Sequence, residues 1–167
     1  MKTILLMATT ADGKIGKHSS HLVDWTGKED KQLFIKLTKD AGVIIMGSNT
    51  YDTLKGPLPN RKNIVMTKNS SRLKYEKNLI FTDKPPKILL NELKAQGYEK
   101  AVLIGGSQIN ALFLKNKLIN EIYMTIVPRL FGTGLSMFSE ETDTQLDLIS
   151  THQMPNGHIL LKYSVNY

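Results

Sequence analysis

The sequence predicts an α/β fold with three layers: a central, mostly parallel sheet of about eight strands, helices on both faces and an antiparallel C-terminal edge. As far as about residue 127, short apolar runs rich in Val, Ile, Leu and Met alternate with helical patterns, which is typical of parallel strands covered by helices. Beyond that point, two strand-like segments are joined by Pro155-Asn156-Gly157, which favours an antiparallel pair.

The size and composition of the chain limit the classes of protein to be considered. Its 167 residues are enough for one domain with a core, so we expect a single domain over 1–167. Cysteine is absent, which excludes disulfides, thiolate metal sites and cysteine nucleophiles. The four histidines have no metal-binding spacing, so no metal site is expected. No apolar run approaches membrane-spanning length, and the run at 4–8 is too short for a signal peptide. We therefore expect a cytoplasmic protein.

The net charge of +7 leaves a different class open, a basic protein that binds nucleic acid or another anion without catalysis. Such a protein would bind any polyanion with a steep dependence on salt. The lysines, however, are scattered along the chain, and no helix-turn-helix, RNA-recognition or zinc-finger pattern is present. A phosphate-rich small ligand would also favour a basic surface around its site. We expect neither a nucleic acid nor a membrane partner.

The N-terminal part predicts a strand, a loop and a helix in that order. The apolar run Thr3–Thr9 ends at turn residues and indicates a central strand. Residues 12–24 are polar and contain Gly, Ser and His, which is typical of a loop. Thr26 is followed three residues later by Glu29, the spacing of a capping box, so we expect a helix from there to about Lys39.

The rest of the chain continues the alternation. Glycines flank a strand at 43–46, and Pro86 opens a helix that continues to about Gln96, with Gly97 as its C-cap. The other expected elements are a short helix at 49–54, a strand at 63–67, a weaker strand at 79–82, strands at 101–104 and 121–127, a helix that includes 110–114, and two antiparallel strands at 145–152 and 158–165.

Asp30 is the sharpest candidate for a catalytic group. It precedes Leu33, Phe34 and Leu37 by three, four and seven positions, and this spacing places its carboxylate on the apolar face of the expected helix. A carboxylate buried there is unfavourable unless something pairs with it. The alternative is an acid in the first turn that only complements the helix dipole.

Two segments resemble the dihydrofolate reductases. Residues 43–51, continuing through Pro-Leu-Pro-Asn-Arg at 57–61, resemble the segment with which that family holds its cofactor and substrate. The segment from Trp25 to Phe34 resembles the one in which a Trp precedes the pterin-binding helix. The resemblance implies that Asp30 is the catalytic carboxylate and binds the pterin, and that Phe34 packs on the pterin.

The resemblance also implies the other substrate contacts. Arg61 corresponds to the arginine that binds the glutamate α-carboxylate of the substrate through a bidentate fork, although a solvated loop arginine is the alternative. Thr125 corresponds to the threonine that hydrogen-bonds the catalytic carboxylate and the pterin amino group. Ala8 corresponds to a position of the first strand that contacts both substrate and cofactor.

A cofactor site is indicated by Gly105-Gly106, which lies between an expected strand and an expected helix. Main-chain amides at such a junction can hold an anion, although a tight turn alone also explains the pair, and GxGxxG is absent. The resemblance implies NADPH, with Thr67-Lys68 on the 2′-phosphate of the adenosine. The cofactor-binding residues it implies are Ala8, Ile15, Gly16, Gly47, Ser48, Asn49, Thr50, Thr67, Lys68, Ile104, Gly105, Gly106, Ser107, Gln108 and Ile109.

Some positions depart from that family. Ser48 stands where a basic residue usually contacts the cofactor phosphate, and Asn110 replaces an aromatic residue. Residues 12–15 and 126–135 resemble the sister family, the reductase of riboflavin biosynthesis. The leading hypothesis is NADPH-dependent reduction of 7,8-dihydrofolate to tetrahydrofolate. The alternative is a 5-amino-6-(5-phosphoribosylamino)uracil reductase or another small-molecule reductase on the same fold. A monomer and a homodimer both stay open.

Overall fold

The computed structural model describes residues 1–167, which form a nine-stranded main sheet, a two-stranded small sheet and four α-helices. The main sheet contains β1 (Lys2–Thr10), β3 (Val43–Gly47), β4 (Lys62–Met66), β5 (Lys74–Tyr75), β6 (Leu79–Thr82), β7 (Lys100–Leu103), β8 (Glu121–Val127), β10 (Gln145–Gln153) and β11 (Ile159–Asn166). The small sheet pairs β2 (Lys14–Gly16) with β9 (Leu135–Ser136). The helices are α1 (Gly27–Ala41), α2 (Ser48–Asp52), α3 (Pro86–Ala95) and α4 (Ser107–Lys115), with 3-10 turns at Ser70–Arg72 and Pro155–Gly157.

The strand order of the main sheet is β10-β11-β8-β1-β7-β3-β4-β6-β5. The six strands from β8 to β6 in this order run parallel to their neighbours. β11 and β10 continue the sheet antiparallel at one edge, and β5 is antiparallel at the other. The expected mostly parallel sheet with an antiparallel C-terminal edge is confirmed, with nine strands instead of about eight.

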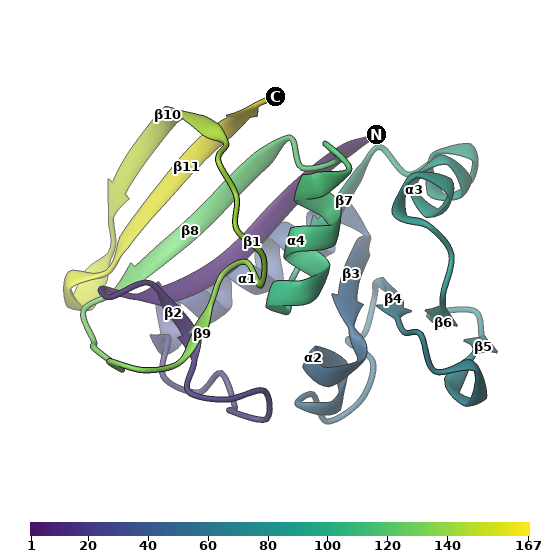
Figure 1. Ribbon diagram of the computed structural model, residues 1–167, viewed down its shortest axis with the longest axis horizontal. Helices are drawn as coiled ribbons and strands as arrows, with labels where there is room; N and C mark the ends of the chain where they lie inside the picture. Colours follow the sequence, from purple (N-terminus) through teal and green to yellow (C-terminus); the bar gives the residue numbers. More distant parts are fainter.

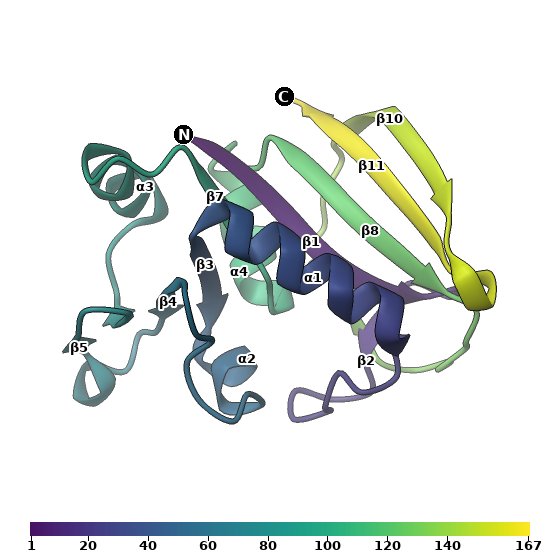
Figure 2. The ribbon, with the colours of Figure 1, turned by 180° about the vertical axis from the view of Figure 1, so that it is seen from behind.

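Each face of the sheet has its own hydrophobic core. Figure 1 shows α4 in front of the sheet, and Figure 2, turned by 180°, shows α1 in front of the opposite face. Side chains of a strand alternate between the faces, so Ile45 packs in the core beneath α3 and α4 while its neighbour Ile44 packs in the core beneath α1. Both side chains are fully buried. We refer to the two sides as the α4 face and the α1 face.

Helix α1 begins one residue after Thr26, but the expected capping box is wrong. Thr26 already has helical dihedral angles, and its side chain makes no capping hydrogen bond, because a capping residue needs an extended backbone to reach the free N–H groups. Gly27 has a positive φ of 84° and lies against the ring of His158. The end of the helix follows the usual pattern, with Gly42 in the left-handed conformation.

Helices α3 and α4 follow the expectations from the sequence closely. Pro86 begins α3, and after its end Gly97 has a positive φ while the N–H of Tyr98 donates to the carbonyl of Leu93. Helix α4 begins at Ser107, directly after the glycine pair, and includes the expected residues 110–114. None of the helices is long and apolar enough to cross a membrane.

The predicted loop at 12–24 contains the short strand β2, which the sequence did not indicate. β2 pairs antiparallel with β9 across more than a hundred residues of sequence. A Cβ atom on Gly134 would lie only 2.6 Å from the carbonyl oxygen of Gly16, so a glycine is required where these segments meet. The pairing holds β2 against the segment that follows β8.

Candidate active site

The predicted catalytic carboxylate lies on α1, at one end of the α1 face. Asp30 is half-buried, one helical turn before Phe34, which packs partly buried against the core of that face together with Leu37. Its carboxylate accepts no hydrogen bond and makes no ion pair with the rest of the chain. The carboxylate is therefore free to accept hydrogen bonds from a ligand that donates N–H groups.

Two further polar groups near this end of the sheet have no partner. Thr125 pairs with Ala8 in the sheet, is fully buried, and its hydroxyl makes no hydrogen bond. Tyr123 packs against the core of the α1 face, so Thr125, two residues later, points to the same face. Trp25 is also buried, and its indole N–H has no acceptor. The hydrogen bond between Thr125 and Asp30 that the resemblance implies is absent from this structure.

Arg61 is a buried cation held by neutral groups. It is only 6% exposed, and its Nε donates to the carbonyl of Pro59 at 2.9 Å while its Nη1 donates to the hydroxyl of Thr38 at 2.7 Å. No carboxylate lies within ion-pair distance of the guanidinium. Burial lowers the pKa of Arg61 from its ordinary value, but that value is so high that the group stays charged. A buried positive charge with only neutral partners favours an anionic ligand.

Sequence reasoning missed three residues between these charged groups. Leu54 and Leu58 are half-buried and pack against the same core as Phe34, so apolar side chains line the α1 face between Asp30 and Arg61. Thr38, on α1, holds the guanidinium but was not singled out from the sequence. The sequence does contain a signal for the two leucines: they are apolar residues, four positions apart, in a segment rich in Gly and Pro that would otherwise be expected to be polar.

A second group of predicted residues comes together where β3 and β7 end. The N–H of Gly47 donates to the carbonyl of Gly105 at 2.8 Å, and the Gly105–Gly106 peptide bond is cis. A Cβ on Gly47 would lie 2.9 Å from Cγ1 of Ile109, and one on Gly106 would lie 3.4 Å from the Thr50 hydroxyl. Gly47 has no room for a side chain and Gly105 has a φ of 94°, so glycines are favoured at these two positions and the main chain can be approached closely. The arrangement fits the pyrophosphate of a dinucleotide, bound where α4 begins.

The first turn of α4 carries the remaining residues of this group. Ser107 is half-buried and Gln108 is exposed, whereas Ile104, just before the glycine pair, is buried. Asn110 is fully buried, and its Nδ2 donates to the carbonyl of Met137 at 2.8 Å while its Oδ1 has no partner. Asn110, which replaces the usual aromatic residue, is therefore held in place through its amide nitrogen, while its amide oxygen has no hydrogen-bond donor.

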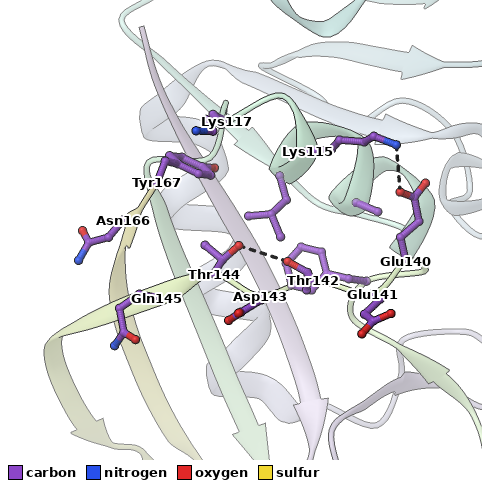
Figure 3. A pocket seen from close by; sticks show the side chains of 13 residues that line it. Lys115, Lys117, Glu140, Glu141, Thr142, Asp143, Thr144, Gln145, Asn166 and Tyr167 are labelled. Carbon is purple, nitrogen blue, oxygen red and sulfur yellow. Dashed lines mark hydrogen bonds and ion pairs between the residues drawn. The ribbon is translucent and has the colours of Figure 1, made fainter.

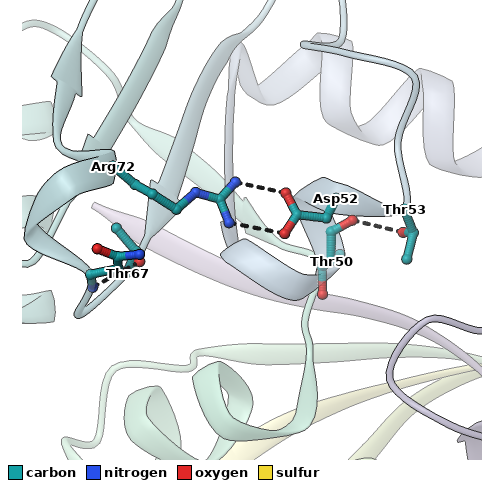
Figure 4. Close-up of polar contacts among 6 residues, drawn as sticks. Thr50, Asp52, Thr53, Thr67 and Arg72 are labelled. Atoms are coloured by element: carbon teal, nitrogen blue, oxygen red, sulfur yellow. Dashed lines mark hydrogen bonds and ion pairs between the residues drawn. The ribbon is translucent and has the colours of Figure 1, made fainter.

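Thr67 and Lys68, which were expected at the adenosine end, directly follow β4, and Figure 4 shows Thr67 together with the pair of Arg72 and Asp52. Arg72 donates through both terminal nitrogens to the carboxylate of Asp52, at 2.9 and 2.6 Å, and this lowers the pKa of Asp52. The guanidinium also lies 5.1 Å from the ring centre of Phe81. Thr67 is buried, and its hydroxyl accepts a hydrogen bond from the main chain two residues later. Lys68 is exposed and makes no ion pair, so its charge is available to a ligand.

Ile15 and Gly16 lie on β2, in a loop that is tied to the segment after β8. The carboxylate of Asp12 accepts hydrogen bonds from the Thr10 hydroxyl and from the main-chain N–H groups of Phe131 and Gly132. These bonds, above all the one from Thr10, hold the pKa of Asp12 below its ordinary value. Phe131 in turn packs edge-on against Trp25, with ring centres 5.1 Å apart. The loop is thereby connected to the site around Asp30.

The Asp12 contacts give a prediction for pH dependence. Because the pKa of Asp12 is lower in the folded state, its stabilisation is complete above the ordinary carboxyl pKa of about 4 and is lost as the pH falls through the lowered value. We expect Asp12→Asn to lower the thermal unfolding midpoint at neutral pH and the difference from the parent to shrink as the pH falls through the lowered pKa of Asp12. Asp143→Asn, an exposed acid without these contacts, is the control. A difference that is independent of pH would contradict this role.

A cavity of about 480 Å³ lies elsewhere, between the C-terminal end of α4, residues 138–145 and the C-terminus (Figure 3). None of the predicted site residues lines it. Its rim carries Lys115 and Glu140, 3.6 Å apart, and both side chains are mostly exposed, so this ion pair contributes little. The candidate site is therefore the pair of regions described above, on the α1 face and at the glycine junction.

Comparison with known proteins identifies the family and the fold. A model of the dihydrofolate reductase family matches residues 2–164. The chain belongs to the dihydrofolate reductase family. Within the family, the type 8 dihydrofolate reductase of Escherichia coli is 32% identical over 148 residues, which cover 86% of this chain and 79% of that protein.

Two further comparisons concern a protein without a named activity and a solved structure of the same fold. The uncharacterized protein YwjB of Bacillus subtilis is 25% identical over 160 residues, covering 91% of each chain. The structure of a diaminohydroxyphosphoribosylaminopyrimidine deaminase/5-amino-6-(5-phosphoribosylamino)uracil reductase from Thermotoga maritima superposes with a TM-score of 0.78 at 16% identity, covering 99% of this chain and 56% of that one. That second likeness is one of fold alone. The chain is thus a reductase of the dihydrofolate reductase type.

Proposed function

We propose that the protein reduces 7,8-dihydrofolate to tetrahydrofolate with NADPH. The observation that carries this proposal is the arrangement on the α1 face: an unpartnered carboxylate at Asp30, apolar side chains next to it, and a buried cation without an acid at Arg61. Dihydrofolate has the complementary parts in the same order, with N–H donors on its pterin, an aromatic linker and a glutamate carboxylate. Each charged group of the site would then gain a partner that the free protein lacks.

The glycine junction supports a dinucleotide as the second ligand. NADPH would supply the hydride when bound. Gly47, Gly105 and Gly106 would let its pyrophosphate approach the main chain, and the first turn of α4 would donate N–H groups to it. Ala8, near the C-terminal end of β1, is a small residue beside Thr125 and would leave room for the nicotinamide and the pterin to meet face to face.

In this proposal the chain orients the substrate and controls one proton. Asp30 would accept hydrogen bonds from the amino edge of the pterin, which makes the ring nitrogen that must be protonated more basic, and water would deliver the proton. The Thr125 hydroxyl and the Trp25 indole, both buried without partners, would bind the same edge or that water. Apolar residues around them would keep other water out.

The second candidate is reduction of an aminopyrimidine ribosyl phosphate. It is favoured by Ser48, which leaves one position at the cofactor phosphate without a cation, and by the fold shared with the Thermotoga maritima protein. A ribosyl phosphate has no α-carboxylate in the position of the folate glutamate and does not need a carboxylate at residue 30. The Asp30→Asn variant therefore separates the two candidates.

Trp25 provides a direct test of binding, because it is the only tryptophan of the chain and lies buried at the proposed pterin site. We expect its fluorescence to be quenched by dihydrofolate in a saturable manner, and NADPH to strengthen that binding. An aminopyrimidine ribosyl phosphate should neither quench it nor compete. Quenching by the phosphate compound but not by dihydrofolate would favour the second candidate.

Lys68 is expected to select NADPH over NADH. Its side chain is exposed, unpaired and directly follows Thr67, so removing its charge should weaken binding of the 2′-phosphate while leaving NADH unaffected. We expect Lys68→Gln to raise the KM for NADPH by roughly tenfold, as for the loss of one charge-assisted hydrogen bond. Lys87→Gln, which removes an exposed lysine on α3, should change neither KM. An equal change for both cofactors would contradict this role.

A further inference from the structure

Helix α2 lies beside the glycine junction but carries no cation of its own. The residue before it, Gly47, donates its N–H to the carbonyl of Gly105, and a Cβ on Gly106 would lie 3.4 Å from the hydroxyl of Thr50. A cofactor whose phosphates bind at this junction therefore passes close to α2. The helix itself, residues 48–52, contains no basic side chain. Any cation that acts there has to come from another element.

Arg72 is a cation from another element that contacts α2. Its two terminal nitrogens donate to the carboxylate of Asp52 at 2.9 and 2.6 Å (Figure 4). Asp52 follows Ser48 by four positions, so the two residues lie on the same face of the helix, one turn apart. The ion pair therefore holds a guanidinium on the face of α2 that also carries Ser48, the position at which a basic residue is missing.

Arg72 comes from the same segment as Lys68. The 3-10 turn Ser70–Arg72 begins two residues after Lys68, and the side chain of Asn69 caps it by accepting a hydrogen bond from the N–H of Ser71 at 3.0 Å. The N–H of Asn69 in turn donates to the hydroxyl of Thr67 at 3.1 Å. These bonds fix the turn directly after β4. One short segment thus presents two cations, of which Lys68 is unpaired and Arg72 reaches across to α2.

The ion pair with Asp52 leaves Arg72 able to bind a further anion. A guanidinium has five N–H donors, and Asp52 accepts from only two. The Arg72 side chain is 32% exposed, and its guanidinium lies 5.1 Å from the ring centre of Phe81, so it is ordered without being covered. The Asp52 side chain is 51% exposed, and a pair so open to water contributes little to stability. A role in orienting Arg72 for a ligand explains the pair better.

We propose that Arg72 binds the 2′-phosphate of the cofactor and supplies the cation that Ser48 does not. This inference rests on the proposed use of NADPH. A phosphate monoester carries nearly two negative charges at neutral pH, which Lys68 and Arg72 together would match. Asp52 is the positioning residue, because it holds the guanidinium in place before the cofactor binds and so reduces the entropy lost on binding. The pyrophosphate, bound by main-chain N–H groups at the glycine junction, does not need Arg72.

Calorimetric titration of the full chain with 2′,5′-ADP and with 5′-ADP tests the proposal, since the two compounds differ only in the 2′-phosphate. We expect Arg72→Gln to weaken binding of 2′,5′-ADP by roughly tenfold, as for the loss of one charge-assisted hydrogen bond, and to leave 5′-ADP unaffected. The control is Lys77→Gln, which removes an exposed lysine without an ion pair and should change neither affinity. An equal loss for both ligands would overturn the assignment to the 2′-phosphate.

Asp52→Asn separates the cation from the ion pair. Both this variant and Arg72→Gln break the pair, but only Arg72→Gln removes the positive charge. We expect Asp52→Asn to bind 2′,5′-ADP at least as tightly as the parent, because it removes a negative charge near the phosphate. Equal weakening in both variants would show that the pair acts only through the fold.

The same titration distinguishes failure of this inference from failure of the proposed function. If the parent binds 2′,5′-ADP and Arg72→Gln binds it equally well, the role of Arg72 is wrong while the use of NADPH stands. If the parent does not bind 2′,5′-ADP at all, the use of NADPH is contradicted, and the role of Arg72 is overturned with it.

Discussion

Asp30→Asn is expected to lower kcat/KM for dihydrofolate by roughly a thousandfold, a typical loss for a group that controls proton transfer. The substitution keeps the size of the side chain and one oxygen acceptor but removes the charge. The carboxylate makes no hydrogen bond or ion pair with the rest of the chain, so the fold should tolerate the change and the loss should be chemical. Steady-state NADPH oxidation with parent and variant measures it.

The matched control is Asp40→Asn, which removes an exposed carboxylate from the other end of the same helix. It should leave kcat/KM within about twofold of the parent, as most surface substitutions do. Thermal unfolding of both variants shows whether stability has changed. If Asp30→Asn reduced dihydrofolate at the rate of the parent protein, the assignment of Asp30 as the catalytic residue would be wrong.

Arg61→Lys is expected to raise the KM for dihydrofolate by roughly fiftyfold with little change in kcat. A lysine keeps the positive charge but cannot donate two parallel N–H groups to a carboxylate, and such a charge-assisted pair contributes about 2–3 kcal/mol. Because the contact is remote from the reacting ring, it should stabilise the bound substrate and the transition state equally. The measurement is a substrate-concentration series for parent and variant.

A dihydropterin that lacks the glutamate separates this role from a structural one. Arg61 also holds Pro59 and Thr38, so the lysine variant could disturb the loop before β4. If the α-carboxylate is its ligand, the truncated substrate should be reduced equally well by parent and variant. A loss that is equal for both substrates would show that Arg61 acts only through the fold. Thr38→Val removes one of the hydrogen bonds while the cation stays, and should have a smaller effect.

The regular part of the fold could be predicted because each element carries its own local signal. The apolar residues 43–46 of β3 are fully buried and lie between Gly42 and Gly47, so the strand was expected within one residue of its observed end. Pairing between distant short segments has no such signal. β2 and β9 have three and two residues, too few for a periodic pattern, and only the close approach of Gly134 to Gly16 reveals their contact. The prediction that Thr26 caps α1 was wrong because a capping pattern in the sequence does not determine the backbone conformation of the capping residue.

In the candidate site, too, some features could be predicted from local sequence patterns and others depend on tertiary packing. The spacing of Asp30 before Phe34 and Leu37 was sufficient to place it on the inward face of α1. The burial of Arg61 could not be read from the sequence, since it results from the packing of the loop before β4 against Thr38. Leu54 lies in that same tertiary arrangement and was missed for the same reason. The roles of these residues in binding and catalysis stay predictions.

The most direct measurement is NADPH oxidation by the purified protein, with dihydrofolate and an aminopyrimidine ribosyl phosphate offered separately. The proposed function predicts rapid turnover of dihydrofolate, tetrahydrofolate as the product, and no turnover of the phosphate compound. Turnover of the phosphate compound alone would contradict the assignment of a folate substrate. Failure to bind NADPH at all would contradict the whole account of the site.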